Sequence, residues 1–209
     1  MIDRWVIRQA LARLAPMLQQ DTNRLCAINL SGQSLGDEKL VTYILNEIAA
    51  HNIPASTLCF EITETSAISH LGKARELAQR LKSAGCSLAL DDFGSGLSSF
   101  SYLKELPVDF LKIDGAFVKN IERNATDRAI VSSIVHVARA MGKKTIAEYV
   151  EDASSLSWVS KLGVDYAQGY CLSEPVPLGT FAVQEKAFQM ELIEPDELFP
   201  VSGHAQHAA

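Results

Sequence analysis

Six short apolar runs, separated by stretches of helical periodicity, constrain the fold of this chain more than any other feature of its sequence. Each run is four to six residues long and typical of a strand buried on both faces of a sheet. Their alternation with amphipathic helices predicts a parallel sheet covered by helices, in the α/β class. The expected strands are residues 25–30, 58–62, 86–91, 109–113, 144–148 and 164–167.

Between these runs, apolar residues recur every three or four positions, as on the buried side of a helix. The chain opens in such a stretch, from Ile2 to about Gln19, and two later stretches stop at Gly85 and Gly142. Glycine is common just past the end of a helix, because it adopts the left-handed backbone conformation without strain. We therefore expect helices between most of the strands.

A polar residue that apolar packing does not explain stands at the C-terminal end of nearly every expected strand. Successive positions lie 20 to 36 residues apart, about one β/α unit each. A closed barrel gathers its strand ends round one mouth, where enzymes of this fold place their chemistry, whereas an open doubly wound sheet spreads them along a line. The pattern therefore favours a TIM-like (β/α) barrel. The polar residues are Asn29, Glu61, Asp91 with Asp92, Lys112, Glu148 and Gln168.

The count of strands is short of a complete barrel. Such a barrel needs eight strands, and about six are visible here. We expect the first two strands to lie before Met1, so that residues 1–193 are one barrel domain incomplete at its N-terminus. Residues 194–209, which end GHAQHAA, are expected to be a flexible tail.

The strand-end carboxylates predict a metal site. Four of them at one mouth would repel each other unless cations compensate, and Mg²⁺ and Mn²⁺ prefer such oxygen ligands. Asp91 and Asp92 are adjacent, and at a strand-to-loop bend both can reach one pair of ions. Taken singly, each residue also has an ordinary explanation as a helix cap, a turn residue or a surface group. Lys112 equally fits a buried ion-pair partner or a lysine that reaches the rim.

Composition narrows the function classes. The net charge of -6 argues against binding a nucleic-acid polymer through phosphate contacts. The four cysteines are far apart without metal-ligand spacing, which is typical of reduced cysteines in a cytoplasmic protein. No apolar run is long enough to span a membrane, so we expect no direct membrane contact, although the domain also fits the cytoplasmic part of a membrane-bound protein. The five histidines do not join the pattern, and no GxSxG, HExxH, P-loop or GxGxxG motif occurs.

With these residues in view, the sequence closely resembles the EAL domain, a family of cyclic di-GMP phosphodiesterases. The resemblance implies a bacterial cytoplasmic signalling hydrolase that opens cyclic di-GMP to linear pGpG with Mg²⁺ or Mn²⁺. It also implies a homodimer and an upstream sensory or cyclase-like domain in a longer protein. The matching pieces are INLSG (28–32), FEITET (60–65), DDFGSGLSSFSYLKELPVDFLKID (91–114), KTIAEYVE (144–151) and DYAQGYCLSEPVP (165–177).

The resemblance assigns a role to each matching residue. Asn29, Glu61 and Asp91 would hold one metal ion, and Asp91, Asp92 and Glu148 a second. Lys112 would orient or polarise the attacking water, with Glu148 a candidate proton acceptor and Gln168 positioning a water. Glu64 would anchor the DDFGSG loop, and Glu151 would have a supporting role.

The sequence departs from the family pattern in three places. The Glu-Ala-Leu segment, which carries a metal-ligand glutamate and is followed by a substrate-binding arginine, does not occur. Tyr149 stands where the family usually has glycine, and Leu97 where an aromatic residue is common. Three hypotheses follow: an active phosphodiesterase, a catalytically inactive module that binds cyclic di-GMP or a partner, and a fragment that folds poorly because its sheet edges are exposed.

Overall fold

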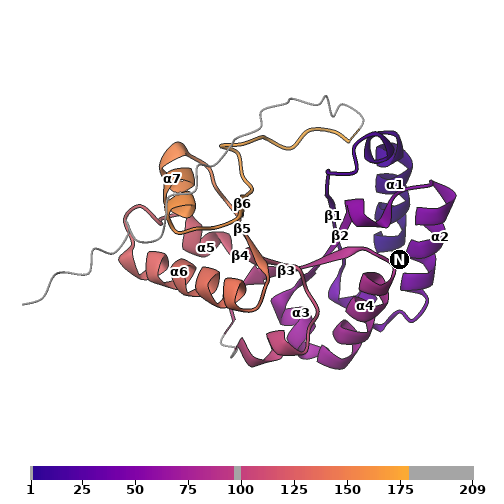
Figure 1. Cartoon of the computed structure of the whole chain (residues 1–209), viewed down its shortest axis with the longest axis horizontal. Helices are drawn as coiled ribbons and strands as arrows, with labels where there is room; N and C mark the ends of the chain where they lie inside the picture. The colour runs from indigo at the N-terminus through magenta and orange to yellow at the C-terminus, as the bar shows by residue number, and fades with distance from the viewer. Residues whose placement is uncertain (1, 97–99, 179–209) are drawn as a thin grey trace, which may run out of the picture.

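The computed structural model describes residues 2–96 and 100–178 of the 209-residue chain (Figure 1). Leu97 and the expected tail at 194–209 lie outside these residues, as does the C-terminal end of the expected 1–193 domain.

Six parallel strands pair in chain order into one sheet. All six expected strands are confirmed, and their ends differ from the expected ones by at most two residues. The strands are β1 (Cys26–Asn29), β2 (Leu58–Thr63), β3 (Ser87–Phe93), β4 (Phe110–Ile113), β5 (Lys144–Ala147) and β6 (Tyr166–Ala167).

Helices connect the strands, and the longer ones lie on the outer side of the curved sheet (Figure 1). The opening helix is confirmed, and Gly85 and Gly142 follow helix ends with positive φ angles of 93° and 66°. The α-helices are α1 (Ile2–Gln20), α2 (Leu40–Ala50), α3 (Glu64–Ser69), α4 (Leu71–Ser83), α5 (Gly115–Val118), α6 (Ala125–Ala140) and α7 (Ala153–Lys161). Short 3₁₀ helices are η1 (Gly32–Gly36), η2 (Ala55–Thr57) and η3 (Phe100–Lys104).

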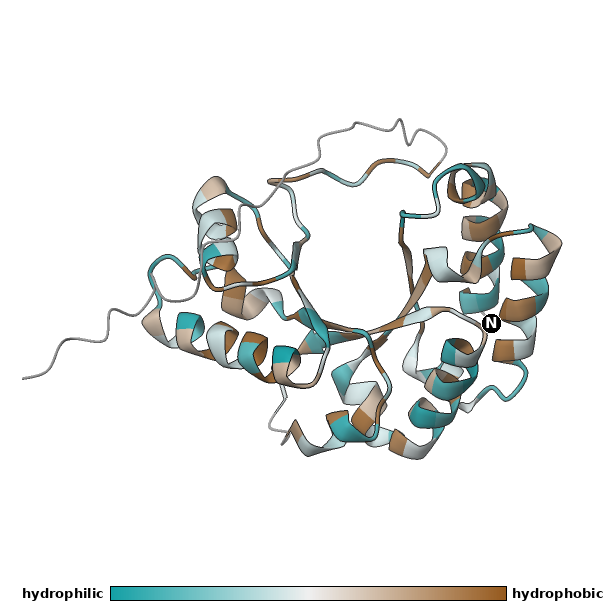
Figure 2. Ribbon diagram, viewed as in Figure 1, coloured by the Kyte–Doolittle hydropathy of each residue, from teal (hydrophilic) through white to brown (hydrophobic). Residues whose placement is uncertain are grey.

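The hydrophobic core lies between the sheet and these helices. Strand residues such as Phe60, Leu88 and Leu111 are completely buried there. Each such side chain stabilises the fold by roughly 1.5–3 kcal/mol relative to an exposed one. The helices carry both apolar and polar residues, as one-sided packing requires (Figure 2).

The inner face of the sheet carries the polar strand-end residues. Register partners in parallel strands point to the same face, which places Asn29 beside Glu61 and Lys112 beside Ile146. Cys59, Ala89 and Lys112, at the centre of this face, are buried, whereas Asn29 and Tyr166 near its edges are exposed. Within the described residues β1 and β6 each pair with one strand only, so the sheet is an open arc, a half-barrel.

None of the helices in residues 2–96 and 100–178 has the length and apolarity needed to cross a bilayer. The four cysteines, all within these residues, are free thiols, and burial raises the pKa values of Cys26 and Cys86 to about 11.

Candidate functional site

A β-bulge at the end of β3 turns two consecutive carboxylates toward the inner face. Leu90 pairs with Leu111 and Phe93 with Ile113, so that Asp91 and Asp92 together lie opposite the single residue Lys112. Two residues facing one is the definition of a bulge, and it breaks the strict alternation of a strand. Asp92 has a φ of 54°, a left-handed conformation that aspartate tolerates better than most side chains. The expected bend is therefore present, with a defined geometry.

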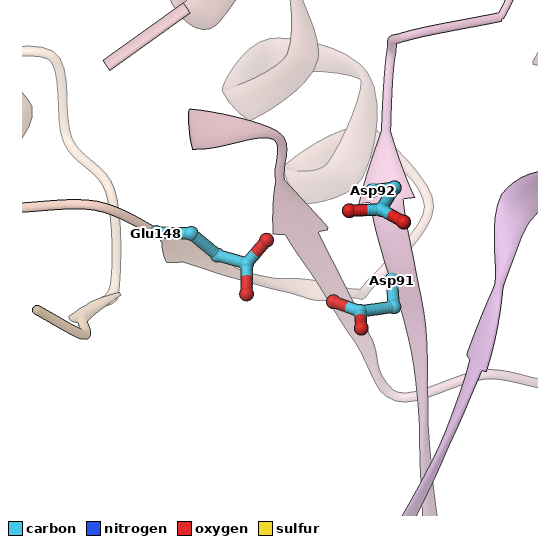
Figure 3. Close-up of side chains that lie close together, drawn as sticks. All are labelled: Asp91, Asp92 and Glu148. Atoms are coloured by element: carbon cyan, nitrogen blue, oxygen red, sulfur yellow. The ribbon is translucent and has the colours of Figure 1, made fainter. Parts of the chain in front are cut away.

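The two aspartates meet Glu148, which follows β5. Asp91, Asp92 and Glu148 each have a carboxylate oxygen within 4.8 Å of the other two (Figure 3). The backbone N–H of Glu148 donates to Ile113 O at 3.3 Å, which holds the end of β5 beside β4. Oxygen ligands this close fit a hard divalent cation.

Lys112 lies at the centre of the carboxylates and is only 3% exposed. Its Nζ is 2.8 Å from Asp91 Oδ1, 2.8 Å from Glu148 Oε1 and 2.9 Å from Glu61 Oε2. Of the two explanations open for this residue, the structure shows the buried ion-pair partner. One ammonium therefore faces three carboxylates, with Asp92 next to them.

The electrostatics of this cluster reflect its surplus of negative charge. Burial raises the pKa of Glu61 and of Glu148, and Lys112 opposes that rise in both. Burial and the charges of Asp91 and Asp114 raise the pKa of Asp92. Burial alone would lower the pKa of Lys112, but hydrogen bonds to its acidic partners outweigh burial and raise it. Added positive charge at this point would relieve the repulsion, so the residues present fit a metal ion.

The remaining expected site residues do not all join this cluster. Glu61 reaches the cluster through Lys112, and Asn29 stands next to Glu61 in register. Gln168 is exposed just after β6, and its backbone N–H donates to Ala147 O at 2.8 Å. Glu151 is exposed between β5 and α7.

Glu64, at the start of α3, bonds to the loop after β3. Its Oε2 accepts from the backbone N–H of Gly94 at 2.9 Å, and its Oε1 accepts from the Tyr102 hydroxyl at 2.7 Å. Glu64 is only 2% exposed, so its carboxylate is held between the end of β3 and η3. The contact with Tyr102 was not expected, because Tyr102 lies 38 residues away in sequence.

Tyr149, beside Glu148, also has a left-handed backbone, with a φ of 58°. Glycine adopts this conformation without strain, whereas a bulky residue does so at a cost of about 1–3 kcal/mol. The tyrosine ring lies over Gly115, where an added Cβ would come within 2.5 Å of Tyr149 Cδ2. Lys119 Nζ lies 4.7 Å from the ring centroid, a cation–π contact that helps hold the ring.

Two further acidic residues, one beside the cluster and one in α1, were not among the expected ones. Asp114 caps α5 by accepting from Ala116 N at 2.8 Å, and its charge acts on Asp92. Asp3 is buried in α1 and bonds to Ser31, two residues beyond Asn29. The available signal for Asp3 was its place on the apolar stripe of Ile7 and Leu11, where a charged residue needs a partner.

Residues 1–175 match the family model of the EAL domain. The chain belongs to the EAL domain family. Among curated proteins, this EAL domain is 47% identical over 183 residues to the cyclic di-GMP phosphodiesterase PdeB of Shewanella oneidensis, covering 88% of this chain and 21% of that protein. It is 40% identical over 177 residues to the cyclic di-GMP phosphodiesterase PdeF of Escherichia coli, covering 85% of this chain and 24% of PdeF. The chain thus spans only about a fifth to a quarter of these relatives' length.

Solved EAL structures have the same architecture. The PaMucR phosphodiesterase in its c-di-GMP complex superimposes with a TM-score of 0.80 at 33% identity, covering 84% of this chain and 72% of that one. The FimX EAL domain from Pseudomonas aeruginosa, bound to c-di-GMP, has a TM-score of 0.77 at 34% identity and covers 83% and 69%. The TIM-like barrel class expected from the sequence is confirmed, with six of its strands in the described residues.

Proposed function

We propose that this EAL domain hydrolyses cyclic di-GMP to linear pGpG in a metal-dependent reaction. The observation that carries the proposal is the convergence of Asp91, Asp92 and Glu148 on one point at the C-terminal ends of the strands. The names of PdeB and PdeF, and the ligand named in the PaMucR and FimX structures, supply the substrate.

Two divalent ions, Mg²⁺ or Mn²⁺, are the proposed cofactors. Asn29, Glu61 and Asp91 are the ligands proposed for one ion, and Asp91, Asp92 and Glu148 for the other. When bound, such ions activate a water and neutralise the charge of the phosphate that it attacks. The bulge in β3 supports this assignment, because it lets adjacent aspartates serve the same pair of ions.

Three side chains are proposed to act on the attacking water. The Lys112 ammonium, held between Asp91 and Glu148, would orient the water and polarise it. Glu148 would accept its proton, and Gln168 would position it from the end of β6. The water oxygen bonds to phosphorus while the bond to the leaving ribose 3′ oxygen breaks, and that oxygen takes up a proton. Glu64 would anchor the loop after β3, and Glu151 would play a supporting role.

The oligomeric state, the neighbouring domains and the cellular location are proposed from the family resemblance and the sequence. The family resemblance supports a homodimer and an upstream sensory or cyclase-like domain, and PdeB and PdeF are four to five times longer than the matched region. The four free cysteines in the described residues support the cytoplasm, where thiols are kept reduced. The net charge of -6 supports a cyclic dinucleotide rather than a nucleic-acid polymer as the ligand.

The deciding experiment is turnover of cyclic di-GMP to pGpG with Mn²⁺ and with EDTA. It should be run on this chain and, where its gene continues upstream, on the longer protein. We expect EDTA to abolish turnover, and Glu61→Gln and Asp91→Asn each to lower it by more than the roughly 10–100-fold that loss of a supporting contact costs. Glu105→Gln is the matched control, since it removes an exposed acid that pairs with Arg75 rather than with Lys112. Undiminished turnover in Glu61→Gln would contradict the metal assignment.

A second candidate function is binding of cyclic di-GMP without cleavage. It is favoured by the inner face of the described sheet, on which the proposed ligand Asn29 is exposed rather than held in the carboxylate cluster. Ligand binding by calorimetry with no pGpG formed, in the longest version available, would support binding alone. Lys112→Ala separates the two functions, because it should impair turnover more than binding.

A further inference from the structure

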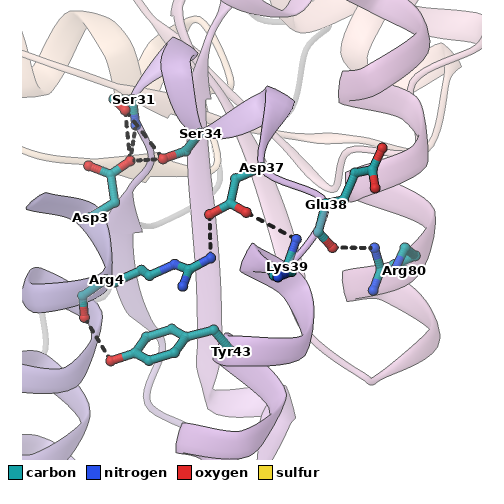
Figure 4. Close-up of polar contacts among 9 residues, drawn as sticks. All are labelled: Asp3, Arg4, Ser31, Ser34, Asp37, Glu38, Lys39, Tyr43 and Arg80. Carbon is teal, nitrogen blue, oxygen red and sulfur yellow. Dashed lines mark hydrogen bonds and ion pairs between the residues drawn. The ribbon is translucent and has the colours of Figure 1, made fainter. Parts of the chain in front are cut away.

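Asp3 is a buried acid outside the carboxylate cluster, and one of its carboxylate oxygens accepts three hydrogen bonds. It lies on the buried stripe of α1 and is 6% exposed. One oxygen, Oδ2, accepts from the Ser31 backbone N–H at 2.8 Å, from the Ser31 hydroxyl at 2.8 Å and from the Ser34 hydroxyl (Figure 4). All three donors belong to the segment that follows β1, so this single carboxylate fixes α1 against the end of that strand.

The same segment is held from its other side by β2 and α3. The Leu30 N–H donates to Glu61 O at 2.8 Å, which extends the β1–β2 pairing one residue past Asn29. Gly32 lies so close to α3 that an added Cβ would meet Ser66 Oγ at 2.6 Å. Residues 30–32 are therefore clamped between α1 and the start of α3, directly after the proposed ligand Asn29.

The neighbouring residue of α1 holds the far end of the segment. Arg4 pairs with Asp37 at 2.6 Å and lies over the Tyr43 ring at 5.4 Å, while the Tyr43 hydroxyl donates to Arg4 O (Figure 4). Consecutive residues of one helix thus hold the start and the end of residues 31–37. Only the Asp3 contact adjoins β1, which makes Asp37 a matched comparison for Asp3.

We propose that Asp3 is a positioning residue of the metal site, acting through Ser31 to hold the end of β1 so that Asn29 stands beside Glu61. The metal part of this inference rests on the proposed function, because it needs Asn29 to be a ligand. Apolar packing of Ile7 and Leu11 would dock α1 without any carboxylate, whereas Asp3 fixes the position of one backbone N–H next to the ligand. Its loss would act on the direction of Asn29 rather than on the fold alone.

The test compares Asp3→Ala, Asp3→Asn and Asp37→Asn with the unaltered chain. Amide hydrogen exchange reports the end of β1 without any metal, and calorimetry with Mn²⁺ reports the site. We expect Asp3→Ala to speed exchange of the Leu30 and Ser31 amides and to raise the Mn²⁺ Kd roughly 10–100-fold. Asp3→Asn, which keeps an acceptor oxygen, should recover part of both. Asp37→Asn should leave the Kd and the Leu30 exchange within about twofold while breaking a contact of the same helix.

Each outcome distinguishes a positioning role of Asp3 from a role in stability alone. A lower melting temperature in Asp3→Ala with unchanged Leu30 exchange and unchanged Mn²⁺ Kd would overturn the proposal, as would equal effects in Asp37→Asn. If Asp3→Ala does not fold, Asp3→Asn and Ser34→Ala, which removes one of the three donors, carry the same comparison. If the unaltered chain binds no Mn²⁺, the proposed function fails, and faster Leu30 exchange in Asp3→Asn but not in Asp37→Asn still supports the hold on β1.

Discussion

Two polar regions of this EAL domain differ in how their charges are compensated. In the Asp3 network, one carboxylate meets three neutral donors, and the neighbouring arginine has its own acid in Asp37. In the Lys112 cluster, one ammonium meets Glu61, Asp91 and Glu148, and Asp92 adds a further negative charge beside them. In the Asp3 network, hydrogen bonds compensate the single buried charge. In the Lys112 cluster, the acidic groups outnumber the one base that could neutralise them.

The difference separates a polar group that serves the fold from one that serves a reaction. Burying a charge destabilises a protein unless hydrogen bonds or opposite charges compensate it, and three hydrogen bonds do so for Asp3. A cluster that does not meet it stays costly until a cation binds, which is a common property of functional sites. The comparison therefore predicts that removing an acidic charge will stabilise the metal-free Lys112 cluster but destabilise the Asp3 network.

Removal of the Lys112 ammonium should have the largest effect on stability. Lys112→Met would leave three carboxylates facing one another, and loss of one partner from a buried ion pair costs about 3–5 kcal/mol. We expect a loss of that size in EDTA, measured by urea unfolding, and partial recovery with Mn²⁺, since metal ions would replace the missing charge. A variant as stable as the unaltered chain in EDTA would contradict the account of the cluster.

Removal of one surplus acid should stabilise the metal-free domain. Asp92→Asn eliminates a charge that is repelled by Asp91 and Asp114 and keeps the size of the side chain. Asp92 is exposed, so water screens part of this repulsion, and we expect the free energy of unfolding in EDTA to rise by at most about 1 kcal/mol, while Mn²⁺ binding weakens. Lower stability in EDTA would show that Asp92 is not repelled by its neighbours.

Removing the charge of Asp3 should destabilise the domain, in contrast to removing the charge of Asp92. The pH dependence of stability tests this expectation. Burial alone would raise the pKa of Asp3, but hydrogen bonds from Ser34 and Ser31 outweigh burial and lower the pKa below its ordinary value of 3.8. A lowered pKa means that the charged form stabilises the fold above pH 3.8, and that this contribution is lost as the pH falls through the folded-state value.

We therefore expect the unaltered chain to be more stable than Asp3→Asn near neutral pH, by about 1–2 kcal/mol for hydrogen bonds to a charged group. The difference should shrink as the pH falls below 3.8. Urea unfolding of both proteins at several pH values measures it. A difference that is independent of pH would mean that the charge of Asp3 does not contribute.

The sequence predicted the strands that carry the site better than it predicted the contacts between the side chains of the site. Strands and helices follow from local periodicity, so all six strands and the polar residues at their ends could be predicted. The bulge could be anticipated only as a bend, because the register of Asp91 and Asp92 against Lys112 depends on how β3 pairs with β4. Asp3 could not be assigned a partner, since Ser31 lies 28 residues away and many serines fit such a role equally.

An exposed ion pair should have the smallest effect on the free energy of unfolding. Arg75 and Glu105 are 3.2 Å apart with side chains 48% and 55% exposed, so water screens both charges. We expect Arg75→Gln to change the free energy of unfolding by at most about 1 kcal/mol, and less in high salt. The same urea titration at low and high salt measures it. An effect as large as that of Lys112→Met would mean that ion-pair geometry, rather than burial among surplus carboxylates, sets the stability of these contacts.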